Sequence, residues 1–164
     1  MRPPSAIRRS LGAKVVANSL PTPLRDTGQA MSQENVEIVR TIFAARERGD
    51  FSDAGWAHPE IDYVVVDGPE PTSYKGLAGL TQAMREMLSP WDHYHGQVEE
   101  CRELDAERVL VLLHARGRGK ASGLELDALS GQQAQVVHVR DGEVTKILVY
   151  YDREHAFADL GLSE

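Results

Sequence analysis

Two side chains in the run 109–118 have the chemistry of an acid–base site. His114 and Arg116 share one face of this predicted strand, because alternate residues of a strand point to the same side. An imidazole titrates near neutral pH, and a guanidinium offers a fork of donors that suits an anion. If their face lines a pocket, the pair predicts a general base beside an anion clamp. If that face is convex, both lie at a dimer interface or at the surface.

Further polar candidates lie near the ends of other predicted strands. Asp67 follows the first strand and is a third candidate catalytic group, and with Asp62 and Tyr63 it is placed to line the mouth of a cavity. The favoured prediction for Tyr63 is packing in the wall with its hydroxyl at the rim. His138 lies on a neighbouring strand, and it joins His114 only if the register brings the two together.

Two other polar features are predicted to be structural. Asp152 directly precedes a helical run, and as an N-cap it would satisfy free amide groups, a contribution of about 1 kcal/mol. This role is favoured over a catalytic one. His93 and His95 have no nearby third ligand, and two ligands make a weak metal site. We therefore expect no metal and no cofactor.

Large apolar and aromatic side chains are placed to form the wall of an apolar cavity. The same residue types at regular spacing are also typical of an ordinary core. The candidates for ligand binding are Phe43, Trp56, Tyr63, Met84, Met87, Trp91, His138, Val149 and Tyr151.

Apolar periodicity and breaker residues divide the first half of the chain into elements. Two prolines after the first strand remove donors and exclude a continued ladder. The expected elements are a helix from its N-cap Ser32 to Gly49, a short helical turn at 52–57, a strand at 61–66, a loop at 67–71 and a helix at 77–87.

The second half predicts a meander of strands and a short terminal helix. Asp141 and Gly142 tolerate positive φ and therefore predict a tight hairpin turn. Neither face of the runs 109–116 and 144–151 is plainly polar, so both faces of the sheet should be covered, which predicts a homodimer through the sheet. The expected strands are 94–104, 109–118, 124 or later to 139, and 144–151, followed by a helix that ends before Gly161.

The composition bounds the class of protein. A chain of 164 residues with 41% hydrophobic residues is long enough for one domain with a core. The single cysteine excludes an internal disulfide framework and fits a reducing cytoplasm. The sequence has no long apolar run that predicts a membrane span. Its net charge of -7 argues against a general nucleic-acid binder.

The basic residues are unevenly distributed. Residues 1–30 contain five of the 18 basic residues and one of the 25 acidic residues, together with four prolines. We predict a disordered basic leader at 1–30, which need not belong to the native product, and a folded domain at 31–164. A basic targeting arm is the alternative for the leader.

Four short motifs occur in an order typical of one superfamily. They are Phe43-Ala44-Ala45 before Gly49-Asp50-Phe51, then Tyr74-Lys75-Gly76, Arg140-Asp141-Gly142 and Tyr150-Tyr151-Asp152. With these spacings, residues 31–164 resemble the SnoaL-like family of the nuclear-transport-factor-2-like superfamily. The resemblance implies an α+β fold in which a strongly curved, mixed, mostly antiparallel sheet forms a cone around the N-terminal helices, with frequent dimers and an apolar internal pocket.

The chain departs from the enzymes of this superfamily where they handle protons. Ile42 and Val64 stand near the positions of the tyrosine and the aspartate of ketosteroid isomerases, and Val149 stands at an aspartate of epoxide hydrolases. An aliphatic side chain neither accepts nor donates a proton. These departures favour a small-molecule-binding domain over an enzyme.

Three hypotheses for function follow. The first is a binding domain for a small hydrophobic molecule. The second is an isomerase, cyclase or hydrolase that transfers protons on a small hydrophobic substrate, through His114 with Arg116 or through an aspartate near the first strand. The third is a dimerising accessory module whose own side chains fill the pocket.

Overall fold

The computed structural model describes residues 24–68, 70–125 and 131–163. The chain divides into two units, residues 1–31 and 32–164, and most of the expected leader lies outside the described residues. The described helices and strands are, in order, α1 (Leu24–Glu47), β2 (Ala57–Val65), β3 (Thr72–Lys75), α2 (Gly76–Leu88), β4 (Trp91–Glu103), β5 (Arg108–Gly119), β6 (Gln132–Arg140), β7 (Glu143–Tyr150) and α4 (Arg153–Leu160).

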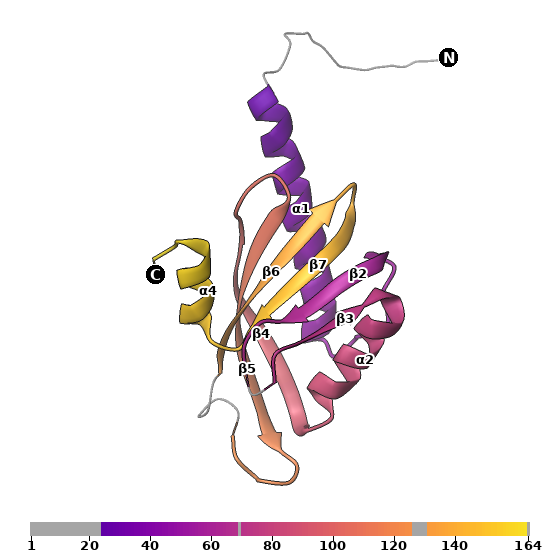
Figure 1. Cartoon of the computed structure of the whole chain (residues 1–164), viewed down its shortest axis with the longest axis vertical. Helices are drawn as coiled ribbons and strands as arrows, with labels where there is room; N and C mark the ends of the chain where they lie inside the picture. Colours follow the sequence, from indigo (N-terminus) through magenta and orange to yellow (C-terminus); the bar gives the residue numbers. More distant parts are fainter. Residues whose placement is uncertain (1–23, 69, 126–130, 164) are drawn as a thin grey trace, which may run out of the picture. The chain divides into compact units, whose positions relative to one another are not determined.

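Six strands form one curved, open sheet in the order β3-β2-β7-β6-β5-β4 (Figure 1). The pair β2 and β7 is parallel, whereas the other four neighbouring pairs are antiparallel. The sheet is therefore mixed and mostly antiparallel, and the predicted α+β class is confirmed. The hairpin prediction is also confirmed, because φ is 53° at Asp141 and 80° at Gly142, between β6 and β7.

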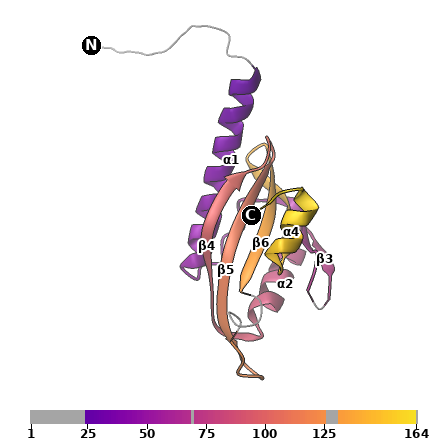
Figure 2. The same ribbon diagram turned by 90° about the vertical axis from the view of Figure 1, so that its left-hand side faces the viewer.

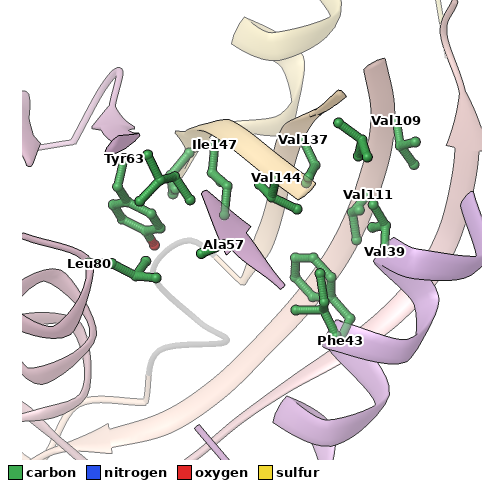
Figure 3. Packing of buried hydrophobic residues seen from close by; sticks show 14 of the residues in the cluster. Val39, Phe43, Ala57, Tyr63, Leu80, Val109, Val111, Val137, Val144 and Ile147 are labelled. Atoms are coloured by element: carbon green, nitrogen blue, oxygen red, sulfur yellow. The ribbon is translucent and has the colours of Figure 1, made fainter. Parts of the chain in front are cut away.

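One face of the sheet packs on α1 and α2. Val109 and Val111 of β5 lie in one buried cluster with Val39 and Phe43 of α1. Figure 3 shows these side chains meeting, with Val137 and Ile147 contributed by the neighbouring strands. Because β-branched residues suit a pleated surface and pack well there, this cluster fixes how the strands cover the helix.

The opposite face is covered by α4. Leu110 and Leu112 form a second buried cluster with Ala156 and Phe157 of α4. Figure 2 shows α4 and α1 on opposite sides of β5 and β6. The apolar pattern on both faces of β5 is thus explained within a single chain, because each face has its own helix.

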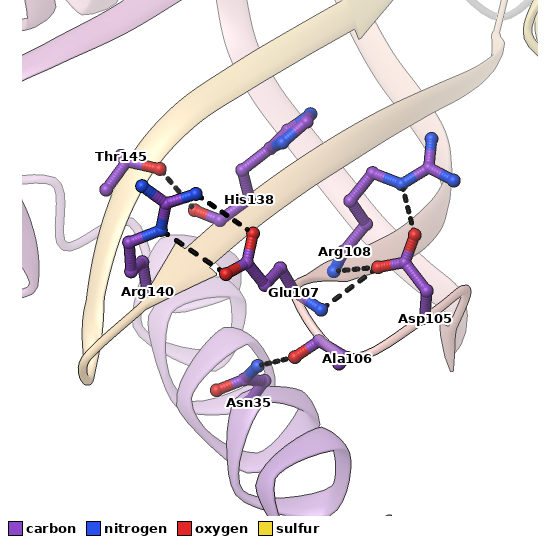
Figure 4. Close-up of polar contacts among 8 residues, drawn as sticks. All are labelled: Asn35, Asp105, Ala106, Glu107, Arg108, His138, Arg140 and Thr145. Atoms are coloured by element: carbon purple, nitrogen blue, oxygen red, sulfur yellow. Dashed lines mark hydrogen bonds and ion pairs between the residues drawn. The ribbon is translucent and has the colours of Figure 1, made fainter. Parts of the chain in front are cut away.

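The predicted N-cap at Ser32 is wrong, since α1 begins at Leu24. No proline interrupts residues 24–47, so the helix can extend upstream of the serine. Instead, Ser32 Oγ donates to the backbone oxygen of Asp105 over 3.4 Å, and Asn35 donates to that of Ala106 over 2.9 Å (Figure 4). These polar side chains join α1 to the turn between β4 and β5.

The region between α1 and α2 also differs from the prediction. Residues 52–54 are not helical, and only a turn at 55–56 precedes β2. β2 begins at Ala57 and contains Pro59, which a register irregularity between Ala57 and Asp62 accommodates. β3 was not predicted, because a four-residue edge strand of mostly exposed residues has no apolar alternation. The expected loop 67–71 therefore connects two paired strands.

Candidate functional site

A cavity with a volume of about 850 Å³ lies between the sheet and α2. It is lined by residues of β2, β3, α2, β4 and β6, and by residues that follow β2 and β7. Its wall is dominated by one methionine and five aromatic side chains, Tyr63, Tyr74, Met87, Trp91, Tyr94 and Tyr151. Ligand sites of proteins have this size and this apolar character.

Tyr74 is fixed in the wall by an acidic partner. Its hydroxyl donates to Glu86 Oε1 over 2.5 Å, and Gln82 donates to the other oxygen of that carboxylate over 2.9 Å. The hydrogen bond to Glu86 raises the pKa of Tyr74 to about 12. Tyr63 contacts Tyr74 edge to face, with 6.3 Å between ring centroids. These contacts orient the rings of Tyr63 and Tyr74, and the hydroxyl of Tyr63 takes part in none of them.

Tyr63 and Tyr94 give the cavity polar groups that remain available. Tyr63 is only 2% exposed, and its hydroxyl, like that of Tyr94, has no hydrogen-bond partner within the described ranges. Burial raises the pKa of Tyr63 and brings the pKa of Tyr94 to about 12. Both phenols are therefore neutral at physiological pH and can each donate one hydrogen bond to a bound molecule.

An acidic side chain closes one end of the same cavity. Asp67 accepts from the backbone N–H of Tyr151 over 2.6 Å and from that of Asp152 over 3.3 Å. Its Oδ2 also lies 3.0 Å from His155 Nδ1. Asp67 and His155 both line the cavity, so the loop after β2 is joined there to the start of α4.

His155 contacts carboxylates through both of its ring nitrogens. Its Nε2 lies 3.5 Å from Asp159 Oδ2, which also accepts from the hydroxyl of Tyr150 over 3.0 Å. The hydrogen bond to Asp67 is the largest cause that raises the pKa of His155, and the charges of Asp159 and Asp67 act in the same direction. These contacts favour the protonated form of His155 and attach α4 to the loop after β2.

This ion pair gives stability a defined pH dependence. Because the pKa of His155 is higher in the fold than its ordinary value of 6.5, its stabilisation is complete below that value and is lost as pH rises through the raised pKa. We expect the melting temperature of His155→Ala to lie furthest below that of the parent protein in mildly acidic buffer. The difference should shrink towards alkaline pH. Thermal melts of both proteins across this range check it, and a difference that grows with pH would contradict the assignment.

Five predicted site residues lie together around the cavity. They are Tyr63, Asp67, Met87, Trp91 and Tyr151. Trp56 and Met84 instead line a second, smaller hollow between α1 and α2. Val149 is buried in the core on the α1 side. Phe43 belongs to that core too and also reaches a third hollow, beside β4.

His114 and Arg116 do not line the cavity. They alternate with the buried Leu113 and Ala115, and therefore share the α4 side of the sheet with Leu110 and Leu112. His114 Nδ1 lies 3.9 Å from Glu99 Oε2, and the same carboxylate accepts from Arg153 Nη2 over 2.6 Å. Arg116 is exposed. His114, the predicted general base, therefore lies in a cluster of polar side chains with Glu99 and Arg153 beside α4.

The register also separates the two histidines of the sheet. His138 pairs with Arg108, six positions along β5 from His114, which corresponds to about 20 Å along a strand. Its Nε2 is buried and has no hydrogen-bond partner within the described ranges, and burial is the main cause that lowers its pKa. Figure 4 shows Thr145 at the backbone oxygen of His138, and His138 is not among the residues that line the cavity.

The structural role of Asp152 is confirmed. Its side chain accepts from the backbone N–H of Glu154 over 3.0 Å, as an N-cap does. Gly161 ends α4 with a φ of 70°. Within the described ranges, no three His, Cys, Asp or Glu side chains are grouped to hold a metal ion. None of the described helices combines the length and apolar composition needed to cross a membrane.

Several residues of the site were missed from the sequence. Tyr94 was expected at the start of a strand, Tyr74 appeared only within a short motif, and His155 was assigned to the terminal helix without a role. The available signal was the count of aromatic residues near the ends of strands. This count could not show which side chains contact one another in the fold. The contacts join residues that are far apart in the sequence, such as Asp67 and His155, which lie 88 positions apart.

Comparisons with known proteins identify the fold. An NTF2-like protein from Burkholderia thailandensis is 18% identical, with a TM-score of 0.61 over 70% of this chain and 88% of that one. Bal32a from a soil-derived mobile gene cassette is 14% identical, with a TM-score of 0.64 over 79% and 98%. A protein with a ketosteroid isomerase-like fold from Catenulispora acidiphila, solved with trimethylamine, is 16% identical, with a TM-score of 0.56 over 77% and 94%.

No family model and no curated protein matches the sequence. The solved structures establish that the chain has the nuclear-transport-factor-2-like fold, in agreement with the predicted resemblance.

Proposed function

We propose that this protein binds a small, flat, hydrophobic molecule that carries a hydrogen-bond acceptor. The observation that supports this proposal most directly is the 850 Å³ cavity with its aromatic wall. Aromatic rings offer flat apolar contact area, and the phenols of Tyr63 and Tyr94 offer two neutral donors to an acceptor on the ligand. The open volume argues against an accessory module whose own side chains fill the pocket.

Binding is favoured over catalysis by the state of the polar groups. Asp67 already accepts two backbone N–H groups and contacts His155, while His155 is held between two carboxylates. A general base needs a free lone pair within reach of the proton that it removes. Ile42 and Val149 stand where the resembling enzymes have a tyrosine and an aspartate. Both are buried aliphatic residues of the core, so neither can transfer a proton.

One observation supports a second candidate function. The carboxylate and imidazole of Asp67 and His155 lie 3.0 Å apart in the cavity wall. In an enzyme that transfers protons on a hydrophobic substrate, this pair would replace the predicted His114 and Arg116. Turnover of a bound compound that is lost in His155→Ala while binding persists would favour this enzyme over the binding domain.

The proposal includes a homodimer through the sheet. α4 already covers the apolar centre of one face. A second copy would therefore contact the remaining, more polar part of that face, where Arg116 and Arg118 of β5 are exposed. An interface of this composition would resemble the polar rim of known interfaces more than a domain core.

The binding proposal is tested by titrating the protein with 2-acetylnaphthalene, a flat probe with one carbonyl acceptor, in a calorimeter. We expect saturable binding and a dissociation constant roughly tenfold higher for the double variant Tyr63→Phe/Tyr94→Phe, because each lost hydrogen bond contributes about 0.5–1.5 kcal/mol. Tyr150→Phe is the matched control, since its hydroxyl bonds to Asp159 and does not line the cavity.

The outcomes separate the proposal from its alternatives. Equal affinity of the double variant and the parent protein would exclude the two phenols as ligand donors. Absence of heat with this probe, together with a mass free of adducts for freshly purified protein in native mass spectrometry, would contradict a ligand-binding cavity. A co-purified adduct would instead identify the class of natural ligand directly.

A further inference from the structure

A second hollow of the molecule contains an arginine in unusual surroundings. Arg46 lies in the last turn of α1 and lines a groove of about 620 Å³ between α1, the segment 50–56 and α2. Its guanidinium carbon lies 5.2 Å from the ring centroid of Phe43, 5.9 Å from that of Phe51 and 5.4 Å from that of Trp56. Three rings thus surround one cation.

These contacts fix the cation without neutralising it. Aromatic faces and the carboxyl end of a helix both favour a positive charge. Within the described ranges, however, no hydrogen bond or ion pair involves the Arg46 side chain. Burial is the largest cause that lowers the pKa of Arg46, yet a guanidinium stays charged in proteins and carries five N–H donors. Arg46 is half-buried, and charges taken out of water are normally paired.

Three acidic residues line the same groove, Glu37, Asp50 and Asp53, and within the described ranges none of them forms an ion pair with Arg46. Asp50 Oδ1 accepts from the N–H and the Oγ of Ser52 over 3.0 and 2.6 Å. Asp53 Oδ1 accepts from the N–H of Gly55 over 2.8 Å. These carboxylates order the loop around Trp56, whose Nε1 donates to the backbone oxygen of Asp53 over 2.7 Å. The loop thereby holds an indole against the guanidinium.

We propose that this groove is a binding site for the carboxylate of a small organic acid. The fork of N–H groups on Arg46 matches a carboxylate bidentately. The apolar body of the acid would lie along the groove, where Ile38, Leu80 and Met84 contribute apolar side chains. This site is separate from the aromatic cavity, and the proposal does not depend on the function assigned to that cavity.

The experiment follows the Arg46 Nε–Hε resonance by NMR while the protein is titrated with 3-phenylpropionate. The neutral counterpart is 3-phenyl-1-propanol, which has the same apolar body. We expect a saturable shift with the acid and a dissociation constant roughly tenfold lower than that of the alcohol, because hydrogen bonds between charged groups are the stronger class. Arg46→Met should raise the dissociation constant of the acid to that of the alcohol.

Arg85→Met is the matched control, because Arg85 is an exposed arginine of α2 that does not line the groove. It should bind the acid as the parent protein does. Arg46→Lys keeps a charge without the fork, and it should bind the acid more weakly than the parent protein and more tightly than Arg46→Met. Circular dichroism melts establish that each variant is folded.

Three results would overturn the proposal. They are equal affinity for acid and alcohol, undiminished binding by folded Arg46→Met and Arg46→Lys, and an Arg46 resonance that does not move up to the solubility limit of the acid. The last result would mean that water alone solvates the guanidinium. Tyr63 and Tyr94 lie within electrostatic range of Arg46 but do not line its groove. Their phenylalanine variants should therefore leave the dissociation constant of the acid unchanged, so failure here and failure of the cavity proposal are distinguishable.

Discussion

Replacement of Leu110 by alanine should lower the free energy of unfolding by about 3 kcal/mol, within the range for a large buried side chain that leaves a cavity. Leu110 is 0% exposed and packs in the cluster beneath α4 with Ala156 and Phe157. Removal of its isobutyl group takes contacts from both the sheet and the helix. Chemical denaturation of the purified variant, followed by far-UV circular dichroism, measures the loss.

Leu77→Ala is the control for this experiment. Leu77 is 41% exposed on α2, so its loss should change the free energy of unfolding by less than about 1 kcal/mol. The measurement is repeated at several protein concentrations. A stability of the parent protein that rises with concentration would show that a second copy also contacts the sheet, as the proposed homodimer requires. A loss below about 1 kcal/mol in Leu110→Ala would contradict the burial of Leu110 beneath α4.

The second large effect is expected at Asp67. Asp67→Ala should lower the free energy of unfolding by about 2–4 kcal/mol, because it leaves the part-buried N–H of Tyr151 unsatisfied and removes the main hydrogen-bond partner of His155. The side chain is 15% exposed and accepts from the N–H groups of Tyr151 and Asp152. Asp67→Asn retains one acceptor oxygen and should lose roughly half as much. Urea denaturation curves of both variants provide the comparison.

Asp62→Ala, within β2, is the matched control. Its carboxylate pairs with Lys75 over 3.1 Å, and both side chains are well exposed, so the loss should stay below about 1 kcal/mol. Asp67→Ala should also abolish most of the pH dependence that His155 contributes, since the main partner of the imidazole is gone. Similar losses in the Asp62 and Asp67 variants would contradict the anchoring role of Asp67.

Anchoring at Asp67 matters for the cavity as well as for stability. Asp67, Asp152 and His155 all line the cavity, so the contacts that hold α4 also shape one end of the binding site. A variant that releases α4 should therefore alter ligand affinity without touching the aromatic wall. This coupling separates the structural role of His155 from a catalytic one, because binding and stability would change together.

Local patterns were sufficient to predict much of the fold. The hairpin at Asp141-Gly142, the cap at Asp152 and the helix that ends near Ser89 each depend on neighbouring residues. Turn geometry, capping and helical periodicity operate over a few positions of the chain. The order of such elements was enough to predict the superfamily fold and five residues of the cavity wall.

The assignment of chemistry to faces required the tertiary structure. A strand pattern shows that His114 and Arg116 share a side, but the curvature of the sheet and the docking of α4 determine which side encloses the cavity. The prediction of an N-cap at Ser32 was wrong for the same reason, which is that a distant segment provides the partner. The Ser32 hydroxyl donates to the backbone oxygen of Asp105, 73 positions away.

The sequence by itself determined most of the elements, their order and the apolar character of both sheet faces, because these depend on short-range sterics and on residue type. The exceptions are β3, the start of α1 and the segment 52–57. Only the tertiary structure decided that Asp67 joins His155 and that Arg46 lies among three rings with no acidic partner among the residues that the structure describes. Such groupings are set by register, twist and packing between distant segments. Those properties arise from the whole chain at once, and no local pattern of residues records them.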